Sequence, residues 1–217
     1  TLTVDSTNGL VDFLYGISFD GGMGFDELRF MQTGGPTHTS TTYSVGPNPG
    51  QGTHEIVGAT ATQTVYFENL EPVIDLAPSA TLVVDATPAH NAINYRQGAN
   101  SGTVLVGGAA TGEVTIDNFE SIEFANKTEL IINALAGDDV VNLNNPSGPN
   151  TPAGLNLITV NGDEGNDRIT TSEGVATNVE FFGGPGDDML DASGVQPSFT
   201  AWLDGGFGND LLIGGPG

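Results

Sequence analysis

The sequence predicts an all-β protein made of short strands separated by tight glycine-rich turns. Three observations lead to this prediction. A phrase of the form G-G-x-G-[N/D]-D-x-L recurs along the chain, each copy leads into a short apolar run, and the later copies are about 22 residues apart. Glycine allows the backbone to turn tightly, and short apolar runs between turn residues are typical of strands.

Two full copies of the phrase stand near the end of the chain, at Gly183–Leu190 and Gly205–Leu212. Their glycines leave backbone carbonyls free to point inward, and the aspartate adds a hard anionic oxygen of the kind that calcium prefers. The apolar residue two places later begins a strand whose side chain faces a core. One phrase supplies too few ligands for calcium, so two stacked phrases are needed. A single copy would be equally consistent with a hairpin loop, but several copies in frame disfavour that interpretation.

The phrase resembles the calcium-binding nonapeptide of repeats-in-toxin (RTX, hemolysin-type) proteins. That resemblance implies a right-handed parallel β-helix, or β-solenoid, in which calcium lies between stacked phrases, bound by aspartate carboxylates and loop carbonyls. It covers Ile17–Phe30 and Asn133–Gly217 specifically, and the middle of the chain only by pattern. The interval from Gly205 to Gly214 matches the nine-residue spacing of the family. Elsewhere the phrases come once per coil, so we expect a single calcium-binding edge.

The candidate metal ligands follow from the spacing of the phrases. Asp139, Asp167, Asp188 and Asp210 are separated by 28, 21 and 22 residues, and the longest interval contains an apparent inserted loop at 145–152. Coils of about 22 residues would stack these carboxylates in one column, at the inter-strand spacing of about 4.8 Å. Asn and Asp ladders also stack in metal-free β-helices, but carboxylates so close together repel strongly. The expected metal-binding residues are Gly21, Gly22, Gly24, Asp26, Gly137, Asp139, Gly162, Gly165, Asp167, Gly183, Gly184, Gly186, Asp188, Gly205, Gly206, Gly208 and Asp210.

In chain order, the sequence predicts one β-solenoid domain over residues 1–217. Residues 1–30 hold the first repeat, in which Phe25 stands where other copies have Asn or Asp. Residues 31–61 are rich in Thr, Gly and Pro and are predicted to form an irregular coil or a protrusion. A metal site on His38 and His54 is possible there, although single surface histidines are far commoner. Residues 62–132 are predicted to form degenerate coils, and 133–217 the calcium-binding coils.

An internal duplication links the middle of the chain to the later phrases. Val65–Val73 matches Val114–Ile122 at an offset of 49, and Leu82–Tyr95 matches Leu130–Leu143 at an offset of 48. Where the second copy carries Gly137-Asp138-Asp139, the first carries Ala89-His90-Asn91. Stacking alone must therefore hold the first copy, and we expect His90 to be a solvent-facing turn residue.

The charge balance excludes several classes of partner. The chain has 4 basic and 27 acidic residues, a net charge of −23. Nucleic acid is excluded because phosphate binding needs clustered Lys and Arg, and anionic membrane surfaces are disfavoured for the same reason. No apolar run is long enough to span a membrane. The absence of cysteine leaves the redox compartment undetermined. A start at Thr1 is expected of a mature product or a piece of a longer chain, and an end within a phrase suggests further repeats or head-to-tail self-association.

These features predict a secreted or cell-surface structural module, such as a stalk, an adhesin or a self-assembling fibre subunit. Calcium is scarce in the cytosol and about millimolar outside the cell, where extracellular modules bind it. Self-repulsion would keep the chain expanded inside the cell, and calcium would fold it outside because binding energy becomes folding energy. Calcium is the only cofactor expected. A surface glycan or protein ligand is possible.

Two alternatives remain open at this point. Parallel β-helices also host polysaccharide lyases and hydrolases, but the four basic residues of this chain are dispersed and no catalytic constellation is apparent. The pairs Glu68 with Glu71 and Asp117 with Glu120 are more typical of solvated faces, so no catalytic residue is expected. The chain could also be the calcium-folding passenger of a type I secreted hydrolase.

Overall fold

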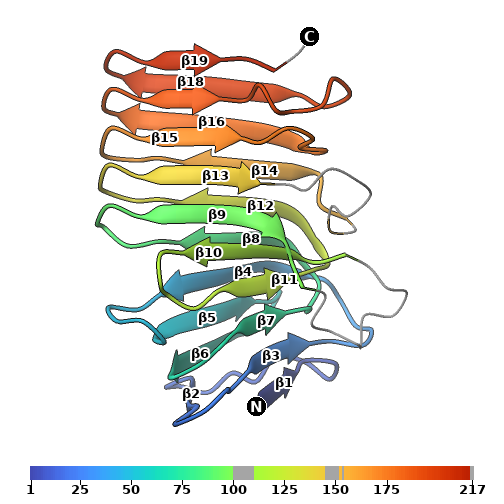
Figure 1. Cartoon of the computed structure of the whole chain (residues 1–217). Coiled ribbons are helices and arrows are strands. Elements are labelled where there is room, and N and C mark those ends of the chain that lie inside the picture. The colour runs from blue at the N-terminus through green and yellow to red at the C-terminus, as the bar shows by residue number, and fades with distance from the viewer. Residues whose placement is uncertain (100–109, 145–151, 153, 216–217) are drawn as a thin grey trace.

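Two large mixed β-sheets make up the part of the chain that the structure describes. The computed structural model describes residues 1–99, 110–144, 152 and 154–215, and within them the chain forms 19 strands and no helix. One sheet has ten strands in the order β1-β3-β7-β11-β10-β9-β13-β15-β17-β19, and the other has nine in the order β18-β16-β14-β12-β8-β4-β5-β6-β2. The sheets lie face to face and rise together from the N-terminus to the C-terminus (Figure 1). The predicted all-β class is confirmed.

The strands are short, and most begin or end at a turn rich in glycine, asparagine or aspartate. Their bounds are β1 Leu2–Asp5, β2 Ile17–Asp20, β3 Leu28–Met31, β4 His38–Val45, β5 Gly52–Val57, β6 Thr62–Glu68, β7 Val73–Asp75, β8 Ser79–Asp85, β9 Ala92–Gln97, β10 Gly112–Ile116, β11 Ile122–Phe124, β12 Lys127–Asn133, β13 Val140–Asn144, β14 Leu157–Asn161, β15 Arg168–Thr171, β16 Asn178–Pro185, β17 Met189–Asp191, β18 Ala201–Phe207 and β19 Leu211–Ile213.

Stacked apolar side chains form the core between the two sheets. In the nine-stranded sheet, Ile158 of β14 pairs with Leu130 of β12 on one side and Val179 of β16 on the other. All three side chains are at most 1% exposed, and each belongs to the large apolar cluster that contains residues of both sheets. Each fully buried aliphatic side chain contributes about 1.5–3 kcal/mol. Strand register is therefore strongly fixed, because a slip by one residue would turn every such side chain outward.

The register of the later strands reproduces the spacing of the aspartates. Val140 pairs with Arg168, Arg168 with Met189, and Met189 with Leu211, all in parallel. These pairings correspond to steps of 28, 21 and 22 residues (168 − 140, 189 − 168 and 211 − 189). The opposite sheet takes the same three steps from Leu130 through Ile158 and Val179 to Ala201. Each layer of the later chain thus consists of one strand from each sheet.

The segment 31–61 is not the irregular coil that its composition predicts. It forms β4 and β5, which pair antiparallel as a hairpin inside the nine-stranded sheet, and β4 also pairs in parallel with β8. Between its glycine and proline clusters the sequence is rich in Thr, Tyr, Ile and Val, which favour strands. Tyr43 and Ile56 are each 1% exposed. Burial of these side chains outweighs the turn-forming composition at the ends of the segment.

The middle of the chain departs from uniformly parallel stacking. The strands β4, β5 and β6 pair antiparallel, as do β9, β10 and β11. Of the duplicated segments, Val65 lies on β6 of one sheet and Val114 on β10 of the other, so their first parts are not stacked. Their later parts are stacked in register, with Val73 opposite Ile122 and Leu82 opposite Leu130. The prediction of parallel coils is therefore wrong over the antiparallel strands.

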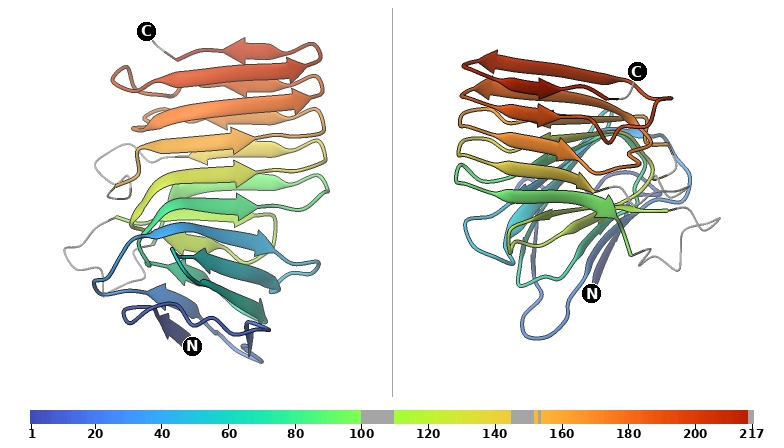
Figure 2. Two further views of the ribbon diagram at one scale, coloured as in Figure 1. Left: turned by 180° about the vertical axis from the view of Figure 1, so that it is seen from behind. Right: turned by 45° about the horizontal axis from the view of Figure 1, so that its top comes forward.

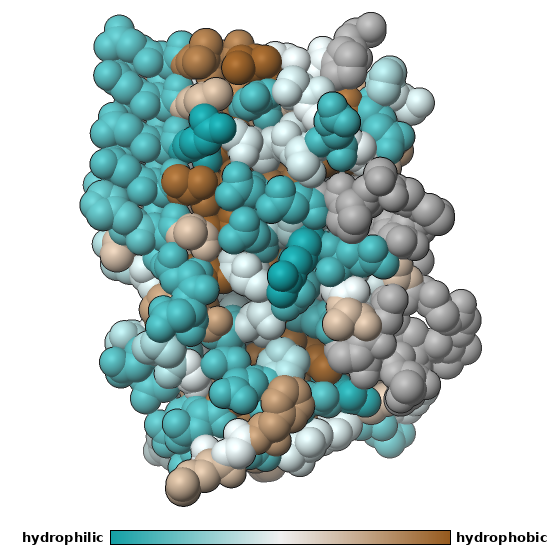
Figure 3. Space-filling model, viewed as in Figure 1, coloured by the Kyte–Doolittle hydropathy of each residue, from teal (hydrophilic) through white to brown (hydrophobic). Residues whose placement is uncertain are grey.

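The turns that contain the glycine and aspartate residues follow one another along a single edge of the molecule. Each connects a strand of the nine-stranded sheet to the next strand of the ten-stranded sheet, as from β14 to β15, from β16 to β17 and from β18 to β19. Figure 2 shows the stacked layers above β9 from behind and in a view tilted by 45°. Hydrophilic side chains form a continuous strip along the same edge, at the left of Figure 3. None of the described residues forms a helix that is long and apolar enough to cross a membrane.

Candidate metal centre

The fourth residue of the turns from Gly137 onward is a glycine because the backbone of the neighbouring layer leaves no room for a Cβ. Gly137, Gly165 and Gly208 have φ values of 137°, 146° and 142°, a region that other residues rarely adopt. A Cβ on Gly165 would lie 1.6 Å from the carbonyl oxygen of Gly137, and one on Gly208 would lie 1.7 Å from that of Gly186. Close stacking of the turns therefore explains this glycine without any metal.

A column of hydrogen-bonded aspartates runs along the inner side of the turns. The backbone N–H of Asp139 donates to Oδ1 of Asp167 at 2.8 Å, that of Asp167 to Asp188 at 2.7 Å, and that of Asp188 to Asp210 at 3.0 Å. Below them, the N–H of Asn91 donates to Oδ1 of Asp139 at 2.6 Å. The structure thus brings the four aspartates predicted from their spacing into one column, which we call the inner column.

In the part of the chain that the structure describes, one oxygen of each buried carboxylate in this column has no hydrogen-bond partner. Asp139, Asp167 and Asp188 are only 1–2% exposed, and their Oδ2 atoms are buried and unpaired within the described part of the protein. A buried anionic oxygen without a partner is costly. The inner column therefore needs something that it does not obtain from its own hydrogen bonds: a proton, a water or a cation.

The pKa values of the buried aspartates in the inner column are raised, as expected for carboxylates that lack a partner. Burial raises the pKa of Asp167 to about 7, and the charges of Asp139 and Asp188 act in the same direction against a hydrogen bond from the Asp139 backbone. Burial likewise raises the pKa of Asp139 and of Asp188. In the absence of a cation, the fold thus favours the protonated form of these carboxyl groups.

An outer ladder of side chains lies on the solvent side of the same turns. In it Asp alternates with Asn, so no two carboxylates are neighbours in the ladder. The N–H of Asn166 donates to Asp138 Oδ1, the N–H of Asp187 to Asn166 Oδ1, and the N–H of Asn209 to Asp187 Oδ1, each at 2.9 Å. Hydrogen bonds from Asn166 hold the pKa of Asp138 below its usual range. His90 completes the ladder by accepting from the N–H of Asp138 at 2.6 Å. It is exposed in a turn, as predicted.

The inner side of the turns carries the oxygen donors that calcium prefers. A Cβ on Gly162 would lie 2.4 Å from Oδ2 of Asp167 and 2.6 Å from the carbonyl oxygen of Gly183, so oxygens from two layers converge at that point. The corresponding point at Gly183 is 2.3 Å from Oδ2 of Asp188 and 2.6 Å from the Gly205 carbonyl. In the described residues no three His, Cys, Asp or Glu side chains gather as a metal site. Backbone carbonyls and water would therefore have to supply most of the ligands, and that donor set suits a hard cation.

The raised pKa of Asp167 predicts an unusual pH dependence of stability in the absence of calcium. Because this pKa lies at about 7 in the folded state against an ordinary 3.8, the folded protein binds more protons between those values. Stability in chelator should then fall as the pH rises through that window. The full difference between the two pKa values corresponds to about 4 kcal/mol. Screening by water at this edge of the molecule should reduce the loss to about 2 kcal/mol, or about 4–8 °C in melting temperature. Thermal melts at a series of pH values check this. Asp167→Asn should flatten the curve, and an unchanged slope in that variant would contradict the assignment.

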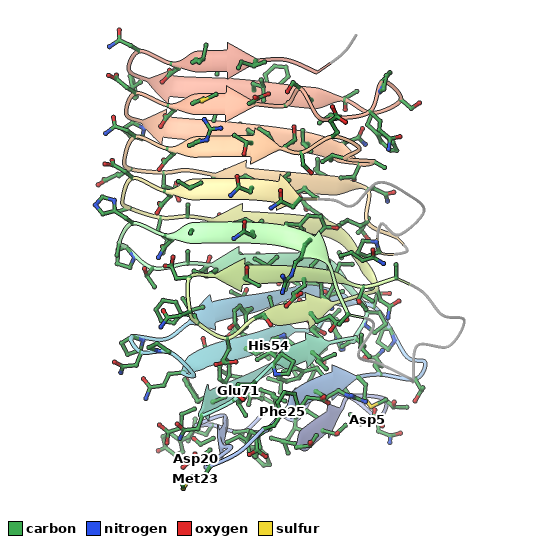
Figure 4. The ribbon with its side chains drawn as sticks, in the orientation of Figure 1. Asp5, Asp20, Met23, Phe25, His54 and Glu71 are labelled. Carbon is green, nitrogen blue, oxygen red and sulfur yellow. The ribbon has the colours of Figure 1, made fainter. Side chains whose placement is uncertain are left out.

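The first predicted phrase does not join the inner column. Its turn lies at the N-terminal end of the molecule, where Asp20 and Met23 are labelled at the bottom of Figure 4. Oδ1 of Asp26 accepts from the amino terminus of Thr1 at 3.2 Å, and the Asp26 carbonyl accepts from the N–H of Glu71 at 2.7 Å. The turn packs against residues that follow β6 instead of a second aspartate, so it lacks the paired carboxylates of the later turns.

The two histidines of the segment 31–61 are buried, not at the surface. His38 is 6% exposed and His54 is 0% exposed. The ring of His54 stacks on Phe30 at a centroid distance of 3.9 Å, and its Nε2 lies 3.1 Å from Oδ2 of Asp75. The same carboxylate contacts Lys127, at 3.0 Å. The sequence reasoning missed this buried group, although the only lysine of the chain, in a β-branched run, was an available signal.

The acidic pairs within each duplicated segment are also rearranged by the fold. Glu71 and Glu120, from different copies, line one cavity of about 380 Å³ together with Asn69 and Asn118. Burial and the charge of Glu71 raise the pKa of Glu120 to about 7. Glu71 and Glu120 are thus brought together across the duplication.

Comparison of the chain with protein-family models, with curated proteins and with solved structures finds no match. The inner column and the turns that carry it are therefore the features of the molecule that indicate a function.

Proposed function

We propose that this chain is a calcium-binding structural module of the repeats-in-toxin type, folded as a right-handed parallel β-helix and acting outside the cell. The observation that carries the proposal is the inner column, in which buried carboxylate oxygens of Asp139, Asp167 and Asp188 have no hydrogen-bond partner among the described residues. A cation bound there would neutralise like charges that the fold holds close together. The layered architecture and the net charge of −23 also support it.

Asp139, Asp167, Asp188 and Asp210 would hold calcium together with the glycine carbonyls of the adjoining turns. The ion would supply only positive charge and a coordination shell, so its role is structural. The residues of the chain do the rest. The Oδ1 atoms fix each carboxylate to the neighbouring layer through backbone hydrogen bonds, and the fourth-position glycines allow the turns to stack closely. A module of this kind suits a stalk, an adhesin or a fibre subunit.

Calcium should raise the melting temperature of the protein strongly, because a ligand that binds only the folded state stabilises it. Each independent site contributes about 2.7 kcal/mol at a calcium concentration of about 100 times its Kd. The measurement is a thermal melt followed by circular dichroism in calcium, in magnesium and in chelator. Magnesium should have a smaller effect, because it requires a near-ideal octahedral site. Equal melting temperatures in calcium and in chelator would overturn the proposal.

A polysaccharide-active enzyme is the alternative, and one observation favours it. Glu71 and Glu120 share a cavity, and the raised pKa of Glu120 is what a general acid requires. If this alternative held, the protein would cleave neutral or anionic polysaccharides, and Glu120→Gln would abolish cleavage while leaving the melting temperature nearly unchanged. We expect no cleavage by the unaltered protein, as measured by the release of reducing ends and of unsaturated sugars.

A further inference from the structure

A lysine, an aspartate and a histidine form a buried charged cluster away from the inner column. Lys127 begins β12, Asp75 ends β7 and His54 lies in β5, and all three side chains are 0% exposed. Lys127 Nζ and His54 Nε2 lie 3.0 Å and 3.1 Å from the same oxygen, Oδ2 of Asp75. His54 is labelled among the side chains of the N-terminal half in Figure 4.

The surroundings hold these groups in fixed positions. Lys127 Nζ also donates to the Ala77 carbonyl, and Oδ1 of Asp75 accepts from the Ala77 N–H at 3.0 Å. The ring of His54 stacks on Phe30, with an angle of 16° between the planes. Nδ1 of His54 is buried without a hydrogen-bond partner in the described structure, so we assign the ring proton to Nε2, which then donates to Asp75. Both oxygens of the Asp75 carboxylate are therefore polarised by hydrogen bonds, and an amine lies against one of them.

A fully buried ion pair between two strands contributes little net stability, because both charges lose their hydration. Removing both charges from water costs several kcal/mol per ion, and mutual attraction often does no more than offset that cost. Covalent capture would replace the ion pair with a neutral amide. We propose that Lys127 Nζ and Asp75 Cγ condense into an intramolecular isopeptide bond. Because β7 belongs to the ten-stranded sheet and β12 to the nine-stranded sheet, the bond would link the two sheets in a chain that has no cysteine.

The proposed reaction balances without any co-reactant. One proton passes from the Lys127 ammonium to Asp75, and the neutral amine then attacks Cγ to form a C–N bond. The nitrogen then loses a proton, which passes to the departing oxygen, while the Nε2–H of His54 stabilises the negative charge on that oxygen through its hydrogen bond. The Cγ–O bond breaks and one water leaves, so an ammonium and a carboxylate become an amide and water.

The pKa values of Lys127 and Asp75 influence the rate of this condensation. Burial lowers the pKa of Lys127, which favours the nucleophilic neutral amine. Burial alone would raise the pKa of Asp75, but the charge of Lys127 and the hydrogen bond from His54 outweigh it, and the pKa lies below its usual range. The ion pair is therefore the resting state, and condensation should proceed slowly after folding.

The test is the intact mass of the folded protein, measured after denaturation, at intervals during incubation in calcium. The expected mass is lower than that of the sequence by one water. Asp75→Asn should also react, but with the loss of one ammonia. Lys127→Arg should keep its full mass, since a guanidinium retains its charge and is not a nucleophile. A full mass for the unaltered protein after prolonged incubation would overturn the proposal.

A succinimide at Asp20-Gly21 or Asp204-Gly205 would also remove one water, so the bond must be located. Peptide mapping should find Lys127 and Asp75 in one branched peptide, and mild alkali, which opens succinimides, should leave the mass deficit unchanged. Loss of water in Lys127→Arg, or restoration of the full mass by alkali, would assign the deficit to a succinimide and refute the cross-link. His54→Phe keeps a ring beside Phe30 and should slow the loss of water at least tenfold; an unchanged rate would remove His54 from the mechanism.

Discussion

Gly165→Ala should destabilise the protein by about 4 kcal/mol, which for a chain of this length lowers the melting temperature by about 8–16 °C. Two effects add at this position. The backbone has a φ of 146°, which strains an alanine, and the new Cβ would lie 1.6 Å from the Gly137 carbonyl oxygen. The clash involves backbone on both sides, so it cannot be relieved by a side-chain rotation, and the two layers would have to separate. Thermal melts in calcium measure the effect.

Two other glycines separate the causes of that loss. A Cβ on Gly22 would meet nothing within 4 Å, but its φ is 80°, so Gly22→Ala should cost only the strain, about 1 kcal/mol. Gly214 has open space and no such φ, so Gly214→Ala should have almost no effect. If Gly165→Ala were no worse than Gly22→Ala, the close stacking of the turns would not be a source of stability.

The spacing of the phrases correctly predicted how the later strands pair. In each phrase the aspartate and the apolar strand residue are two positions apart, so the spacing of the aspartates also sets the strand register. Asp188, for example, lies two residues before the buried Leu190. The aspartates of successive phrases therefore stack whenever the core side chains of the strands that follow them stack. The separations of the aspartates therefore equal the steps of strand pairing. The alternation of Asp and Asn in the outer ladder was also visible in the sequence, at Asp138, Asn166, Asp187 and Asn209.

The features that sequence reasoning missed depend on contacts between distant segments. In the β4–β5 hairpin, glycine and proline at the ends concealed an alternating pattern that is stabilised by pairing with β8. Asp26 matches the phrase locally, but its turn packs against Glu71 and the amino terminus, and no local signal shows this. The cluster of Lys127, Asp75 and His54 joins three strands from different parts of the chain. No spacing rule connects them, because only the packing of one sheet on the other brings them together.

Asp188→Asn should have opposite effects on the metal-free and the calcium-bound protein. Oδ1 of the asparagine can still accept from the Asp167 N–H. A neutral amide takes the place of a carboxylate whose Oδ2 is buried and has no hydrogen-bond partner among the described residues, so the cost of burying that anionic oxygen is removed. In chelator the variant should therefore melt about 2–4 °C higher, a gain of about 1 kcal/mol. In calcium it should lose most of the stabilisation, because a neutral amide replaces an anionic ligand.

The neighbouring residue provides a matched control for this reversal. Asp187 belongs to the outer ladder, is exposed, and accepts from the N–H of Asn209 at 2.9 Å, a role that asparagine can fill. Asp187→Asn removes the same charge from the same turn but should leave the calcium response and the metal-free melting temperature within about 1 °C of the original, as for most surface substitutions. Melting curves for both variants in calcium and in chelator complete the comparison. Equal responses would mean that net charge, and not the inner column, governs the effect of calcium. A full calcium response in Asp188→Asn would rule out its carboxylate as a ligand.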